Sequence, residues 1–112
     1  MAQPLPPITA TDLKQRLDSG EKPRLLDVRE PHEYVSDLGH VDGSELVPLG
    51  QVAQNVSRFE GEAREIVVIC RSGMRAAQAA GFLAQRGLKT RVLVGGMLAW
   101  NEAKLPISRD KP

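Results

Sequence analysis

One unbroken apolar run, Ile66-Val67-Val68-Ile69, constrains the fold more than any other stretch of this sequence. Four consecutive β-branched residues leave no polar face for solvent, which is typical of a strand buried on both sides in a parallel sheet. The run ends at Cys70, the only cysteine in the chain. Because open α/β sheets bind ligands outside the carboxyl ends of their strands, we expect Cys70 to lie at a ligand-binding crevice.

A helix is predicted shortly after this cysteine. Apolar residues recur there at the helical spacing i, i+3, i+4 and i+7, namely at Ala76, Ala79, Ala80 and Leu83. Gly87 is expected to end the helix as its C′ residue. The loop over residues 70–75 therefore connects a buried strand to the N-terminus of a helix.

The rest of the chain alternates between strand and helix patterns. Further strands are predicted at residues 24–28, 45–47 and 90–94, and further helices at residues 10–18, 31–37, 49–59 and 97–103. Alternating elements need crossover connections, which indicate a mainly parallel sheet with helices on both faces. We predict one α/β domain over residues 5–106, a three-layer α/β/α sandwich, followed by a polar tail at residues 107–112 that is expected to fray.

Charge and composition narrow the classes of partner. The 112 residues carry a net charge of +1 without a basic run, and only 4% are aromatic, which disfavours a nucleic-acid surface. No stretch has the pattern of an export signal or a membrane span. We therefore expect no nucleic-acid or membrane partner and a cytoplasmic location, which a single cysteine also fits.

The loop after the central strand suits an anion. The first turn of a helix leaves N–H groups unpaired, its dipole favours negative charge, and a short loop can turn its amides inward. Arg71 and Arg75 add two positive charges to the same loop. We expect Cys70 to be a thiolate at neutral pH, and hence a nucleophile inside a cradle for a small oxyanion.

Residues 70–75, Cys-Arg-Ser-Gly-Met-Arg, resemble the active-site loop of the rhodanese family in its small single-domain form. Three more segments resemble signatures of that family and occur in its order. They are Leu26-Asp27-Val28-Arg29 with Glu30-Pro31-His32-Glu33-Tyr34, then Gly39-His40-Val41, and Gly95-Gly96-Met97-Leu98-Ala99-Trp100. The resemblance covers about residues 25–106 and implies a version of the sandwich with about five strands.

The resemblance implies a thiosulfate sulfurtransferase that needs no metal or organic cofactor. Cys70 is then the catalytic residue, and the substrate-binding residues are Arg71, Ser72, Gly73, Met74 and Arg75. The loop ends on Arg75, which is the stronger candidate for binding the anion, whereas Arg71 is expected to face solvent at the entrance.

Asp27 and Arg29 follow a neighbouring strand and are candidate supporting residues. An aspartate aimed at a thiolate would repel it, so we expect Asp27 to brace Arg75 or the loop amides and Arg29 to add positive charge. A structural ion pair is the alternative reading of both. His40, in a turn, is expected to make a structural hydrogen bond rather than to pair with the cysteine.

The expected reaction proceeds through a persulfide. The Cys70 thiolate attacks the outer sulfur of thiosulfate or a similar donor and sulfite leaves, after which a small thiol, a protein thiol or cyanide takes the sulfur. One alternative is a persulfide carrier or docking module that serves one partner protein. Another is a small cysteine phosphatase or arsenate reductase, which is disfavoured because related phosphatases resemble this loop but have one more residue between cysteine and arginine.

Overall fold

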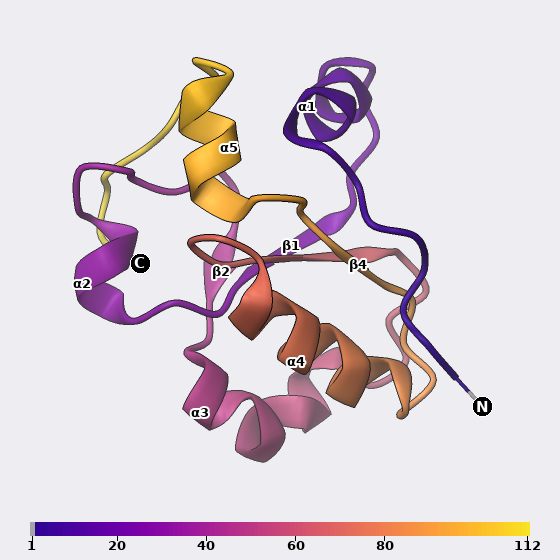
Figure 1. Cartoon of the computed structure of the whole chain (residues 1–112). Helices are drawn as coiled ribbons and strands as arrows, with labels where there is room; N and C mark the ends of the chain where they lie inside the picture. The colour runs from indigo at the N-terminus through magenta and orange to yellow at the C-terminus, as the bar shows by residue number, and fades with distance from the viewer. Residues whose placement is uncertain (1) are drawn as a thin grey trace.

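A four-stranded sheet lies at the centre of the computed structural model, which describes residues 2–112 (Figure 1). Across the sheet the order is β2 (Glu45–Leu46), β1 (Arg24–Asp27), β3 (Ile66–Ile69) and β4 (Thr90–Val92). All neighbouring strands are parallel. The strand predicted from the apolar run is confirmed as β3, an inner strand with every residue buried.

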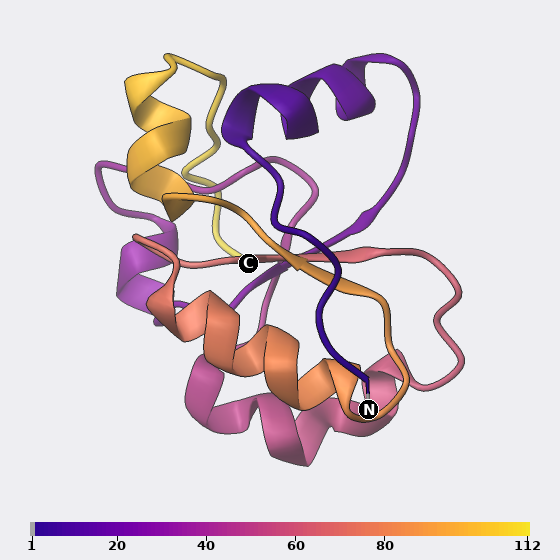
Figure 2. The same ribbon diagram turned by 45° about the vertical axis from the view of Figure 1, so that its right-hand side comes forward.

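Helices cover both faces of the sheet, which confirms the three-layer α/β/α architecture (Figures 1 and 2). On one face lie α1 (Ala10–Asp18) and α5 (Gly96–Glu102), and on the other lie α3 (Leu49–Val52), the 3₁₀-helix η1 (Ala53–Phe59) and α4 (Met74–Ala84). The short helix α2 (Pro31–Tyr34) follows β1. Within residues 2–112, no helix has the length and apolar character to cross a bilayer.

Each face of β3 packs into its own core. Val67 and Ile69 join the cluster that contains Leu13 of α1 and Trp100 of α5. Ile66 and Val68 join the cluster on the other side, where side chains of η1 and α4 are buried. The alternation along a strand therefore explains why the sequence shows no polar position in this run.

The expected count of about five strands is wrong, because the sheet has four. The N-terminal segment takes the place beside β4 that a fifth strand would fill (Figure 2). The N–H of Leu5 donates to the carbonyl of Thr90, and Ile8 forms a single parallel bridge with Leu93. Pro6 and Pro7 have no N–H, so this segment cannot form a continuous ladder.

Several helix bounds differ from the prediction. The helix expected over residues 49–59 divides into α3 and η1. The Asn55 side chain donates to the carbonyl of Gln51, the group that an α-helix would pair with the Asn55 amide. The helix expected over residues 31–37 ends at Tyr34. At the start of the C-terminal tail, Ser108 and His40 exchange two backbone hydrogen bonds of 2.8 Å.

The N-terminus of α5 holds the backbone that follows β3. The amides of Met97 and Leu98 donate to the carbonyls of Cys70 and Arg71 at 2.9 and 3.0 Å. Gly96 permits this approach, because a Cβ on that residue would lie 2.3 Å from the Cys70 carbonyl oxygen. Its φ of +56° also favours glycine. The loop after β3 is therefore fixed by a backbone contact that only glycine allows.

Gly96→Ala should be more destabilising than a glycine substitution without a close contact. Gly87→Ala is the matched control, since Gly87 also has a positive φ but nothing within 4 Å of its would-be Cβ. We expect the control to lose about 1–2 kcal/mol of unfolding free energy from backbone strain. Gly96→Ala should lose roughly 1–3 kcal/mol more from the clash. Urea unfolding measures both, and equal losses would contradict the proposed contact.

Candidate active site

Cys70 lies at the carboxyl end of β3, as predicted, with its sulfur recessed beneath the loop that leads to α4. The residue is 2% exposed and belongs to the core cluster on the α4 side of the sheet. Its Sγ accepts a hydrogen bond from the N–H of Gly73 at 2.9 Å. Gly73 precedes α4 with a φ of +119°, which lets the backbone turn back toward the sulfur. Amide and helix N-terminus together stabilise negative charge there.

The contact with α5 also orients the amides of the loop. A trans peptide holds its C=O and N–H on opposite sides, and the described chain contains no cis peptide bond. The Cys70 and Arg71 carbonyls face α5, so the N–H groups of Arg71 and Ser72 point away from it. The loop backbone therefore offers donors on the side that α5 does not occupy.

The remaining loop residues lie at the surface. Arg71, Ser72 and Met74 are exposed, with 81% of Met74 accessible. Two shallow depressions border the loop. One, of about 330 Å³, is lined by Arg29, Glu33, Ser36, Asp37, Leu38 and Arg71. The other is lined by Ser72, Met74, Arg75 and Gln78. Cys70 lines neither depression, which agrees with its 2% exposure.

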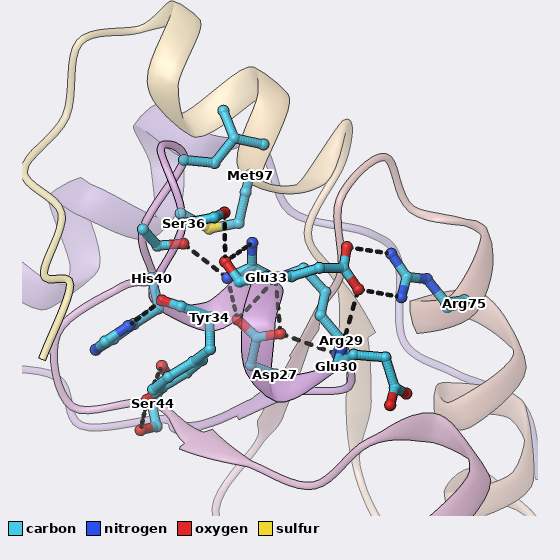
Figure 3. A network of polar contacts seen from close by, with 12 residues as sticks. Asp27, Arg29, Glu30, Glu33, Tyr34, Ser36, His40, Ser44, Arg75 and Met97 are labelled. Carbon is cyan, nitrogen blue, oxygen red and sulfur yellow. Dashed lines mark hydrogen bonds and ion pairs between the residues drawn. The ribbon is translucent and has the colours of Figure 1, made fainter. Parts of the chain in front are cut away.

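Arg75 is held by Glu33, a residue that was not among the predicted site residues. Its Nη1 and Nη2 donate to the two carboxylate oxygens of Glu33 at 2.7 and 2.9 Å (Figure 3). This hydrogen bonding outweighs partial burial and lowers the pKa of Glu33 to about 2. The same carboxylate raises the pKa of Arg75. Both groups are therefore charged at neutral pH and tie α2 to the first turn of α4.

Asp27 pairs with Arg29, so the expectation that Asp27 braces Arg75 is wrong. Both side chains are fully buried, and the guanidinium donates Nε to Oδ1 at 2.9 Å and Nη2 to Oδ2 at 2.8 Å. Nη2 also donates to the carbonyl of Gly39 at 2.7 Å (Figure 3 shows the network around this pair). The alternative reading, a structural ion pair, is the one observed, and it neutralises the charge of Arg29.

His40 makes the structural hydrogen bond expected of it. Its Nδ1 lies 2.7 Å from the carbonyl oxygen of Tyr34, and the two rings stack with centroids 3.5 Å apart. Within residues 2–112, no group of three or more His, Cys, Asp or Glu side chains is placed to hold a metal ion.

One sequence signal could have identified Glu33. The residue lies in the short helix after β1, and Arg75 lies in the helix after the neighbouring β3. Because parallel neighbours end at the same edge, opposite charges in the two following helices are candidates for an ion pair. The sequence analysis assigned that role to Asp27, and the structure gives it to Glu33.

Glu33→Gln should reduce stability in a way that depends on pH. A carboxylate whose pKa falls from 4.5 to about 2 on folding stabilises the fold above pH 4.5, and that contribution disappears as the pH falls through 2. The wild type should therefore exceed the variant by about 1–2 kcal/mol at neutral pH, because solvent weakens this partly exposed pair.

Urea unfolding at a series of pH values from neutral to about 2.5 checks this. Glu60→Gln, at an exposed position whose carboxylate forms no ion pair within residues 2–112, is the control and should show a smaller change. A stability difference for Glu33→Gln that does not shrink with acid would contradict the assignment.

Known proteins resemble this chain in sequence and in fold. A family model described as the Rhodanese-like domain matches residues 9–103. The chain is 37% identical over 100 residues to the putative sulfur carrier protein YrkF of Bacillus subtilis, a match that covers 88% of this chain and 52% of YrkF. It is 34% identical over 102 residues to the probable adenylyltransferase/sulfurtransferase MoeZ of Mycobacterium tuberculosis, covering 88% of this chain and 25% of MoeZ.

The chain thus spans between a quarter and about a half of the length of these two relatives. A solved structure agrees in fold. The crystal structure of a rhodanese-related protein from Thermoplasma volcanium matches with a TM-score of 0.84 and 30% identity, covering 95% of this chain and 100% of that one. The chain belongs to the rhodanese-like domain family, because the family model spans most of its length and the fold agrees.

Proposed function

We propose that this domain is a sulfurtransferase that moves sulfane sulfur from thiosulfate or a similar donor to an acceptor thiol, through a persulfide on Cys70. The observation that carries the proposal is the hydrogen bond from the Gly73 amide to the Cys70 sulfur at the start of α4. That contact stabilises an anion on sulfur, both as the attacking thiolate and as the persulfide.

In the first half-reaction, the Cys70 thiolate attacks the outer sulfur of the donor. A bond forms between the two sulfurs, the bond to the sulfonate sulfur breaks, and its electron pair leaves with sulfite. The persulfide divides one transfer into two easier steps. The N–H groups of Arg71 and Ser72, which face away from α5, are the donors that we assign to the bound anion.

In the second half-reaction, an acceptor thiolate attacks the outer sulfur of the persulfide and releases the Cys70 thiolate. Cys70 is the only cysteine in the sequence, so no thiol of the same chain can resolve the persulfide into a disulfide. The acceptor that we propose is a small thiol or a protein thiol. A cytoplasmic setting suits this step, because thiols are kept reduced there.

The two loop arginines have different roles in this proposal. Arg75 is held by Glu33 and fixes the loop against α2. Arg71 is exposed and forms no ion pair with any residue in 2–112, so its charge is available to a donor. We assign the first contact with the anionic donor to Arg71 and the positioning of the loop to Arg75.

A sulfur carrier without turnover is the second candidate, and the similarity to a protein named as a putative sulfur carrier favours it. The chemistry on Cys70 is the same in both cases, and only the acceptor differs. A small cysteine phosphatase remains disfavoured, because four residues separate Cys70 from Arg75.

Intact mass after incubation with thiosulfate tests the proposal. We expect a gain of one sulfur atom that cyanide removes, and no gain in Cys70→Ser. Turnover with free thiosulfate and a small thiol would identify an enzyme, whereas loading without turnover would identify a carrier. Hydrolysis of an aryl phosphate without any sulfur gain would contradict sulfur transfer.

A further inference from the structure

The charged side chains around the Cys70 loop cancel one another. The cations are Arg29, Arg71 and Arg75, and the carboxylates are Asp27, Glu33 and Asp37. Two exposed side chains nearby, Glu30 and Arg109, also carry opposite charges. Arg109 donates to the backbone carbonyls of Ser36 and Asp37. The charges of these side chains around the loop therefore sum to zero, although two of the six loop residues are arginines.

Glu33 is the carboxylate that acts on the loop itself. It occupies both Nη groups of Arg75, and its depressed pKa keeps it ionised at neutral pH. The pKa of Arg75 is raised chiefly by Glu33 and, to a smaller extent, by Cys70. Arg75 ends the loop that begins at Cys70, and its pairing with Glu33 offsets the positive charge that it would otherwise bring to the loop.

This balance matters for the charge of the donor. Thiosulfate carries two negative charges and must approach a thiolate that carries one. With Arg75 neutralised by Glu33, the approach is assisted by Arg71 and the loop amides. A donor with one negative charge meets about half of this repulsion, because Coulomb energy is proportional to the product of the charges.

We propose that Glu33 determines which donors the site accepts, favouring a sulfane donor with one negative charge at its reacting end over doubly charged thiosulfate. Organic persulfides and thiosulfonates form this class. This inference rests on the proposed function. With a persulfide, Cys70 bonds to the outer sulfur, the bond between the donor's two sulfurs breaks, and the electron pair leaves on the inner sulfur as a thiolate. No net oxidation or reduction occurs.

Two donors isolate the effect of charge. Methanethiosulfonate resembles thiosulfate but has a methyl group in place of one anionic oxygen. With cyanide as the common acceptor, kcat/KM is measured for both donors. The value for thiosulfate is then divided by the value for methanethiosulfonate. This ratio removes any change in Cys70 reactivity or in the folded fraction, since both donors use the same thiolate.

Glu33→Gln keeps a hydrogen-bond acceptor for Arg75 while removing the negative charge. We expect the ratio to rise about five- to tenfold in favour of thiosulfate, and the rise to shrink at high salt. Glu60→Gln makes the same change in net charge at an exposed residue after η1, toward the amino end of β3, and should leave the ratio within about twofold of the wild type.

An unchanged ratio in Glu33→Gln would overturn this inference and leave the proposed function standing, because both donors would still load Cys70. Failure of both donors to load the wild type would overturn the proposed function and the inference with it. If Glu33→Gln does not fold, Asp37→Asn removes another negative charge from the same depression. Its ratio should rise in the same direction, and an unchanged ratio there would also overturn the inference.

Discussion

The backbone contact between the N-terminus of α5 and the end of β3 is the constraint on which the site depends. By taking the carbonyls of Cys70 and Arg71, the amides of Met97 and Leu98 fix two peptide planes and so direct the following N–H groups. The contact needs a glycine at position 96, 26 residues after the cysteine, because a Cβ there has no room. A buried strand, a turn with a positive φ and a helix from elsewhere in the chain together shape the loop to which we assign the anion.

Local signals explain why much of the fold could be predicted. β3 has the bounds that its apolar run indicates, and Thr9 caps α1 by accepting the Asp12 amide at 3.2 Å. Such features depend on a few adjacent residues. The strand count depended instead on whether a proline-rich segment could complete a ladder. The division of residues 49–59 into α3 and η1 coincides with a side-chain contact of Asn55. Its side-chain amide, in place of its backbone N–H, donates to the Gln51 carbonyl.

The pairing of charges was the part that the sequence could not resolve. It placed Cys70 and the two arginines on one loop, but it favoured Asp27 as the residue that braces Arg75 and did not single out Glu33. The structure pairs Asp27 with Arg29, two residues away, and pairs Glu33 with Arg75, forty-two residues away. The second pair exists only because two parallel strands end side by side, and a list of charged residues does not contain that information.

Division of labour between backbone and side chains follows from this arrangement. The Gly73 amide donates to the Cys70 sulfur whichever side chains surround the loop, so the nucleophile of the proposed reaction depends on the backbone. The net charge around the loop depends on side chains such as Glu33, which lies on a different helix and contacts the loop through Arg75. A site built in this way can retain one covalent intermediate while its preference among donors shifts, because the two properties reside in different parts of the molecule.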